Sequence, residues 1–316
     1  MDTTRRKSAR RRRRRRRTVA VVPSLFTLAN GVCGFASIIM ASRIQPAVLM
    51  TGGEGYAEAM TDLGIAGWLL VAGMVFDVLD GRMARLANAA SRFGAELDSL
   101  CDVVSFGAAP AFLLLKLGPT RANPLLYKIL FLAATFYVIC TILRLARFNI
   151  ETDVDEESHR YFKGLPSPAA AGCLASIAIM RSHLYGQHGV LDVEYLGRMV
   201  GNALPFATIL LALLMVSNIT YLHVVNQKIR GRHSFNHLVM LVIMVGFALL
   251  LPELSLVLGF WGFALVGPVR AGVLRWGWLP RKEPTSRYST RDEETSPEEE
   301  RDPMDELYPR PTDENC

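Results

Sequence analysis

The stretch DVLDGRMARLANAASRFGAELDSLCD, residues 77–102, contains the most informative pattern in this chain. Its four aspartates, Asp77, Asp80, Asp98 and Asp102, lie in or beside segments that are otherwise apolar enough to cross a bilayer. An aspartate at the centre of a membrane helix costs roughly 2.5–3.5 kcal/mol on insertion scales, so an acid in such a place is expected to have a function. Four acids at helical spacing need a common partner, and a divalent cation fits their charge. The stretch therefore predicts a metal-dependent enzyme embedded in a membrane.

The rest of the chain is dominated by long apolar runs. Of its 316 residues 51% are apolar. They gather into runs of about 20 residues, the length that a helix needs to cross about 30 Å of hydrocarbon. The fold class predicted is therefore an all-α integral membrane protein. We expect hydrophobic helices at 19–42, 63–84, 93–115, 125–147, 165–182, 203–225, 235–251 and 254–272.

The distribution of Lys and Arg predicts the orientation in the membrane, because cytoplasmic connections are enriched in these residues. If the Arg-rich N-terminus is cytoplasmic, the connections on the same side hold most of the remaining basic residues, among them Arg82, Arg85, Arg144, Arg147 and Lys163. We expect a protein of the bacterial cytoplasmic (inner) membrane. Both termini and the meeting ends of the two acidic helices should face the cytoplasm.

The N-terminus contains an unbroken run of arginines, Arg10–Arg17. A basic segment before an apolar run also fits the opening of a signal peptide. However, the apolar run Val19–Ala41 is longer than an ordinary signal and contains Pro23 and Asn30, so we expect it to be retained. Anionic lipid headgroups attract such a run by roughly 1 kcal/mol per basic residue near the surface. Because no aromatic residues interleave with the arginines, no nucleic-acid partner is predicted.

Helical spacing places the acids on facing sides of two neighbouring helices. Asp77 and Asp80 share one helix face with Gly81 and Ala84, at intervals of three, four and seven residues. Asp98 and Asp102 are four residues apart and share a face of the next helix. Only a short connection separates the two helices, so they should be antiparallel neighbours. Their carboxylate oxygens suit hard cations such as Mg²⁺, Mn²⁺ or Ca²⁺ rather than Zn²⁺.

The residues between these acids indicate a phosphorylated ligand. Gly81, Ala84 and Gly94 are small where bulky side chains would fill the cleft, and Arg85 supplies a cation for a diphosphate. Metal ions together with phosphates are typical of phosphoryl-type transfer. The alternative is that the acids pair with arginines and serve only packing or ion conduction. Four acids with Gly and Ala at the intervening positions favour the enzyme.

The spacing Asp77-x2-Asp80-Gly81-x2-Ala84-Arg85-x8-Gly94-x3-Asp98-x3-Asp102 resembles the signature of the CDP-alcohol phosphotransferases at every fixed position. Further runs are similar to the phosphatidylserine synthase branch of that family. Where that branch commonly has Pro-Asn in the first helix, this chain has Pro-Ser, with Ser24 at the second position. The similar runs are PSLFTLAN (23–30), ELDSLCDVVSFG (96–107), RLARFN (144–149) and GLPSP (164–168).

The resemblance implies a catalytic core of six membrane helices, which would span residues 19–225, and commonly a homodimer. The division that follows is a basic N-terminus at 1–18, the core, an additional transmembrane hairpin of two helices at 226–275 and an acidic tail at 276–316. The resemblance also implies a site for two divalent ions, Mg²⁺ or Mn²⁺, that opens to the cytoplasm. The implied substrates are CDP-diacylglycerol and L-serine, which would give phosphatidylserine and CMP.

Roles for individual residues follow from the matched positions. Asp77, Asp80, Asp98 and Asp102 are similar to the metal-site carboxylates of the family, and Asp102 to the general base as well. Gly81, Ala84 and Arg85 resemble the positions that hold the cytidine diphosphate part of the substrate.

A basic pair beyond the signature gives a hypothesis for the acceptor. Arg144 and Arg147 are three residues apart at the cytoplasmic end of one predicted helix. Serine has a carboxylate, which arginine binds in a bidentate manner. One or both arginines would therefore hold the serine carboxylate or the lipid phosphate, unless they only anchor the helix end.

Two other functions stay open. A sister enzyme would use another alcohol, such as glycerol 3-phosphate or inositol phosphate. A membrane transporter would use the acids as a polar path for a cation or lipid.

Overall fold

The computed structural model describes residues 24–51, 54–86, 92–118, 124–154, 162–188, 193–221, 246–247 and 249–275. The expectations for the basic N-terminus (1–18), the acidic tail (276–316) and most of the helix at 235–251 fall outside these residues.

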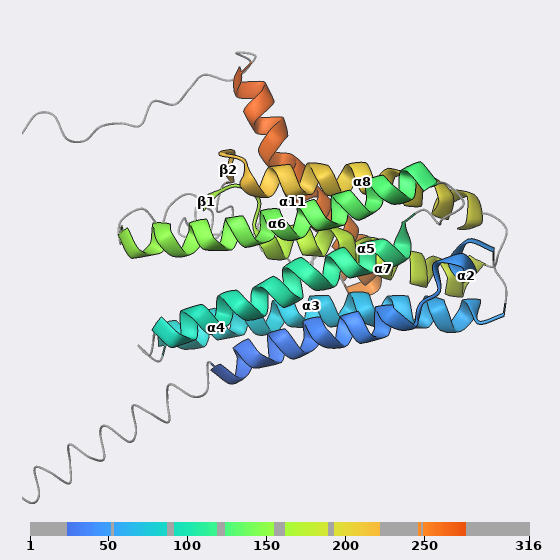
Figure 1. Cartoon of the computed structure of the whole chain (residues 1–316), viewed down its shortest axis with the longest axis horizontal. Coiled ribbons are helices and arrows are strands. Elements are labelled where there is room, and N and C mark those ends of the chain that lie inside the picture. The colour runs from blue at the N-terminus through green and yellow to red at the C-terminus, as the bar shows by residue number, and fades with distance from the viewer. Residues whose placement is uncertain are drawn as a thin grey trace, which may run out of the picture. The chain divides into compact units, whose positions relative to one another are not determined.

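The described chain is almost wholly helical, as predicted, and Figure 1 shows its helices. A first helix, Ser24–Arg43, is followed by the short α2. The second acidic helix is one continuous rod made of α4, the π-helix η1 and α5. The remaining bounds are α2 (Pro46–Thr51), α3 (Tyr56–Leu86), α4 (Arg92–Asp102), η1 (Val103–Ala108), α5 (Ala109–Leu117), α6 (Pro124–Val154), α7 (Ser167–His188), α8 (Val193–Val216) and α11 (Pro252–Arg275), with the two-residue strands β1 (Phe162–Lys163) and β2 (Thr220–Tyr221).

Six described helices are long and apolar enough to cross a membrane, which supports an integral membrane protein. They are Ser24–Arg43, Tyr56–Met83, Phe93–Leu117, Pro124–Ile150, Met199–Val216 and Pro252–Arg270. The helix predicted at 165–182 forms as α7 but is not among them. Alanine, glycine and serine replace large apolar residues along α7, and nearly all of its first half is buried. An interior helix touches protein rather than lipid, so it needs close packing more than high hydropathy.

The core lies between two helix pairs. α3 packs along α7, and α6 packs along α8. Small residues of α7, such as Ala170 and Ala178, let its backbone approach its neighbours, and larger side chains fill the remaining space. The largest fully buried side chains are Tyr137, Phe106, Ile44, Met60, Leu63, Leu70, Leu113, Leu114, Leu117, Leu130, Leu165 and Leu174.

The helix predicted at 203–225 ends earlier than expected, at Val216. Thr220–Tyr221 pairs instead with Phe162–Lys163 as an antiparallel strand. The turn between β1 and α7 depends on Gly164, whose φ of 84° favours glycine and whose added Cβ would collide with the Met215 carbonyl oxygen. These backbone contacts fix the start of α7 against the end of α8.

Beyond the six predicted core helices, α11 packs against α7. Phe260 fills the space that a side chain at Gly172 would need. The indole nitrogen of Trp261 donates a hydrogen bond of 3.1 Å to the Cys173 carbonyl. One helix of the predicted C-terminal pair is therefore present among the described residues.

The first helix approaches the α4–η1–α5 rod very closely. A Cβ added at Gly34 would lie 2.5 Å from Ser105 Oγ and 2.6 Å from Ser105 Cα. A Cβ at Gly31 would lie 3.0 Å from Cys101 Sγ. Glycine at these two positions therefore permits the contact between the two helix backbones.

We predict that Gly34→Ala destabilises the protein, because its methyl group meets the backbone of η1 as well as a side chain. Overpacking of this kind typically costs about 1–3 kcal/mol. Thermal unfolding of the purified protein in detergent measures the effect. Gly262→Ala is the control, because a Cβ there meets no atom within 4 Å. Equal midpoints for Gly34→Ala and the unmodified protein would contradict the close approach.

Candidate active site

Three aspartates from two helices meet at one end of the helices. Asp77 comes from α3, and Asp98 and Asp102 come from α4. One carboxylate oxygen of each lies within 4.8 Å of the others. The sequence-based prediction that the two acidic faces converge is therefore matched by the structure for these three residues.

A positive partner would relieve their mutual repulsion. Two unit charges at about 4.8 Å repel by roughly 3 kcal/mol at an effective dielectric of about 20. Among the side chains that the structure describes, no lysine or arginine lies within salt-bridge distance of the three carboxylates. Oxygen-only ligands from a half-buried cluster fit Mg²⁺ or Mn²⁺, so the donor set is chemically suited to a divalent ion. Direct salt bridges between these acids and arginines are therefore not seen among the described residues.

Asp80 is close to this cluster but is held differently. Its side chain is buried, with 7% exposed, and its Oδ2 accepts a hydrogen bond from the Thr27 hydroxyl. It lies within electrostatic range of Asp77 and Asp98. The structure therefore brings three of the four predicted metal ligands together and places the fourth against the first helix.

Asp102 is the most enclosed member of the cluster. Asn30 is fully buried in the first helix, and its Nδ2 donates a hydrogen bond of 2.9 Å to Asp102 Oδ1. The hydroxyl of Ser105, three residues beyond Asp102, donates 2.9 Å to the Asn30 backbone carbonyl. The π-helix begins directly after Asp102 and is anchored by a 3.0 Å bond from the Tyr137 hydroxyl to the Phe106 carbonyl. π-helical turns occur frequently at functional sites.

The predicted diphosphate positions lie on the last turns of α3. Gly81 is exposed, and a Cβ added there would meet no atom within 4 Å, so this side of the helix is open. Ala84 and Arg85 belong to the same helix, but their side chains are outside the described part of the chain.

Arg144 and Arg147 have different environments. Arg144 Nη1 donates a 2.7 Å hydrogen bond to Ser167 Oγ at the start of α7, and the guanidinium lies within electrostatic range of Asp102. Its Nε is buried without a hydrogen-bond partner among the described residues. Arg147 is half-buried one turn later. Arg144 therefore interacts electrostatically with one of the clustered carboxylates.

Sequence reasoning gave no role to Thr27, Asn30 or Ser167. All three are buried polar residues that contact a predicted site residue. A signal existed for two of them, because Thr27 and Asn30 are three residues apart and share one face of an otherwise apolar helix.

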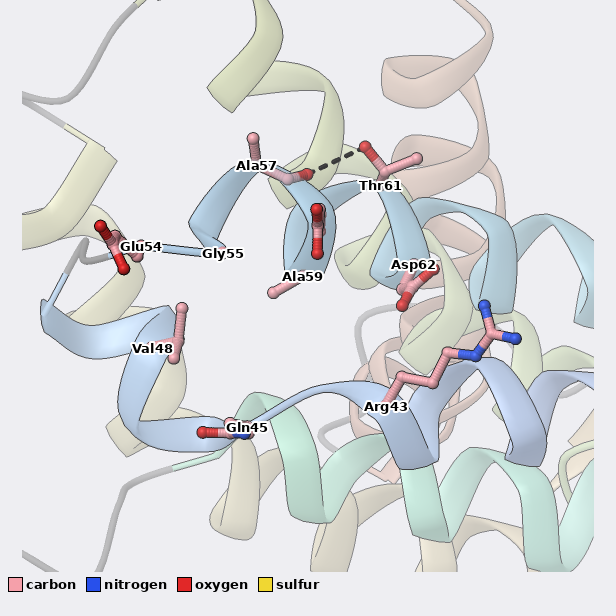
Figure 2. A pocket seen from close by; sticks show the side chains of 10 residues that line it. Arg43, Gln45, Val48, Glu54, Gly55, Ala57, Ala59, Thr61 and Asp62 are labelled. Carbon is pink, nitrogen blue, oxygen red and sulfur yellow. Dashed lines mark hydrogen bonds between the residues drawn. The ribbon is translucent and has the colours of Figure 1, made fainter.

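A pocket of about 590 Å³ lies elsewhere, at the beginning of α3 (Figure 2). Arg43, Glu54 and Asp62 are among its lining residues. Asp62 is about 22 Å from Asp77 along the helix axis, at about 1.5 Å of rise per residue. The pocket is therefore separate from the carboxylate cluster.

Known proteins resemble most of this chain. A CDP-diacylglycerol–serine O-phosphatidyltransferase of Helicobacter pylori (strain J99) is 32% identical over 257 residues, which are 81% of this chain and 91% of the relative. Enzymes of the same name from Saccharomyces cerevisiae and Bacillus subtilis (strain 168) are 37% and 32% identical, covering 48% and 55% of this chain and 51% and 85% of the relatives. The family model for CDP-alcohol phosphatidyltransferases matches residues 20–220. Because the match includes every helix that contributes to the site, the chain belongs to the CDP-alcohol phosphatidyltransferase family.

Proposed function

We propose that the protein transfers the phosphatidyl group of CDP-diacylglycerol to the hydroxyl of L-serine, giving phosphatidylserine and CMP, in a reaction that depends on a divalent metal. The observation that supports this most directly is the convergence of Asp77, Asp98 and Asp102 in a chain of this family. Serine is favoured as the acceptor because the relatives from three organisms are all named CDP-diacylglycerol–serine O-phosphatidyltransferases.

In the proposed reaction, Asp102 accepts the proton of the serine hydroxyl. The serine oxygen bonds to the phosphorus that bears the diacylglycerol, and the bond from this phosphorus to the CMP oxygen breaks. Gly81 and Ala84 leave room for the cytidine diphosphate part, and Arg85 binds its phosphates. The buried position of Asp102 limits the access of water, which would otherwise compete with serine.

Asp77, Asp80, Asp98 and Asp102 would hold one or two Mg²⁺ or Mn²⁺ ions, Asp80 with the oxygen that remains after Thr27 has bound the other. A bound divalent ion would offset the negative charge that develops on the phosphate oxygens. The location of these aspartates on two helices supports such a site, because side chains on helices keep their geometry better than side chains on loops.

The proposed setting is a homodimer in the bacterial cytoplasmic membrane with the site facing the cytoplasm. The start of the first helix, the end of α3 and the Arg144–Ser167 contact lie toward the same end as the carboxylates, and the basic connections predict that this end is cytoplasmic.

The acceptor can be tested with purified protein, CDP-diacylglycerol, Mg²⁺ or Mn²⁺ and a panel of alcohols. We expect CMP release with L-serine and loss of that release when EDTA removes the metal. Release that is faster with glycerol 3-phosphate or inositol phosphate would assign a sister reaction. Metal-dependent flux across vesicles without CMP release would instead indicate a transporter.

We predict that Asp102→Asn lowers kcat by about 10²–10⁴-fold, the usual contribution of a general base. Binding of CDP-diacylglycerol should change little, because the amide keeps the size of the side chain. CMP release measures the rate, and a lipid-binding titration measures the affinity. Glu96→Gln is the matched control, since Glu96 is an exposed acid on the same helix. A normal rate in Asp102→Asn would disprove the assignment of the base.

Arg144 is proposed to bind the serine carboxylate or the lipid phosphate. Its unpaired, buried Nε is a donor without an acceptor among the described residues, and a buried donor in this state costs about 1–3 kcal/mol. An oxygen of a bound carboxylate or phosphate would remove that cost. Arg147 is the second candidate, as the spacing of the pair predicts.

We predict that Arg144→Ala raises the KM for serine about 10–100-fold, since hydrogen bonds to charged groups contribute about 1.5–3 kcal/mol. The KM for CDP-diacylglycerol should stay the same if the carboxylate is the ligand and should rise if the lipid phosphate is. Arg147→Ala, measured in parallel, shows whether the second arginine shares the role. Poor expression with unchanged kinetics in the surviving protein would indicate only an anchor at the helix end.

A further inference from the structure

We propose that Thr27 and Asn30 of the first helix are positioning residues, which orient the carboxylates of Asp80 and Asp102 for binding of the divalent ion. This inference rests on the proposed metal-dependent function, and it concerns residues outside the acidic signature. Its basis is that two side chains of one helix each donate a hydrogen bond to an acid, and that these acids belong to two different helices.

The two donors share one face of the first helix. They are three residues apart, and both are almost inaccessible, with Thr27 2% and Asn30 0% exposed. Thr27 donates to Asp80 on α3, and Asn30 donates to Asp102 on α4. The first helix therefore connects the two acidic helices at the level of the carboxylates.

The direction of both bonds suits charged acids. A carboxylate accepts hydrogen bonds and cannot donate them when it is ionised. With one oxygen of Asp102 bound to Asn30, the rotation of the carboxylate is restricted, and its other oxygen remains available to the cluster. Partners of this kind fix the orientation of metal ligands in many sites, and their loss typically lowers metal affinity about 10–100-fold.

A role limited to helix packing does not explain Asn30. Its Oδ1 is buried without a hydrogen-bond partner among the described residues and faces Gly73 of α3, where an added Cβ would lie 3.0 Å away. A buried acceptor without a partner is unfavourable, and an apolar side chain of similar size would avoid it. The hydrogen bond from Asn30 Nδ2 to Asp102 offsets the cost of burying Oδ1 without a partner.

Asn30 is also held firmly by its surroundings. The Ser105 hydroxyl binds its backbone carbonyl, and Gly31 and Gly34 let the first helix lie directly against α4 and η1. A donor that is fixed in this way can orient Asp102 without losing further conformational freedom when substrate binds.

The test for Thr27 compares Thr27→Val with Thr27→Ser in the full-length protein. Valine keeps the shape and removes the donor, whereas serine keeps the donor. Mn²⁺ binding is measured directly by electron paramagnetic resonance of the free ion, without substrates, and the metal concentration for half-maximal CMP release is measured separately. We expect about 10–100-fold weaker Mn²⁺ binding in Thr27→Val and nearly normal binding in Thr27→Ser. Thr208→Val is the control, because its buried hydroxyl donates to the Leu204 carbonyl within its own helix, and the described residues offer it no bond to another helix.

The corresponding test for Asn30 is Asn30→Leu, which has a similar size and no donor. We expect weaker Mn²⁺ binding, a lower kcat at saturating metal and an unchanged KM for serine. Ser37→Ala is the matched control, since the Ser37 hydroxyl donates 2.9 Å to the Ala66 carbonyl and thus also links the first helix to α3, away from the acids.

Two results would overturn the inference. The first is wild-type Mn²⁺ affinity in folded Thr27→Val. The second is an equal loss of affinity in Thr27→Ser and Thr27→Val, which would show that the hydroxyl donor is not the cause. Absence of Mn²⁺ binding in the unmodified protein would instead contradict the proposed metal dependence itself. If Asn30→Leu does not fold, the Thr27 pair still decides the question.

Discussion

The structure depends on keeping several carboxylates together inside a membrane protein. Asp77, Asp98 and Asp102 lie close enough to repel one another strongly, and they do so where water cannot screen their charge well. Two conditions must therefore be met at once. In the proposed function a divalent ion offsets the repulsion, and rigid neighbours hold the side chains in place before it binds.

The second condition explains why elements outside the acidic signature surround the site so tightly. The first helix touches both acidic helices through hydrogen bonds from Thr27 and Asn30. The π-helix after Asp102 is anchored from two sides, by its own Ser105 to the first helix and by Tyr137 of α6. Each of these contacts is buried, so each one is strengthened by the low dielectric of the interior and costly to leave incomplete.

At the start of α7, too, a packing contact holds a side chain of the proposed site. Gly164 permits a turn that no other residue fits without strain, and this turn places Ser167 against Arg144. Arg144 in turn lies within electrostatic range of Asp102. A turn that is fixed by backbone geometry thus helps to hold Arg144 within electrostatic range of the proposed general base. The side chains of the proposed site are therefore held by the same buried contacts that join the helices of the core.

The helical membrane fold, the convergence of acids from two helices and the family could all be predicted from the amino-acid sequence. These features depend on local periodicity: the length of apolar runs, the spacing of three and four residues between acids, and the shortness of one connection. The folded structure was needed to show that Asp80 binds Thr27 while the other three acids converge, that Arg144 binds Ser167, and that α8 ends at Val216. Each of these features depends on contacts between residues far apart in the chain, such as Asn30 and Asp102. The periodicity within one helix does not predict which side chains of another helix will contact it.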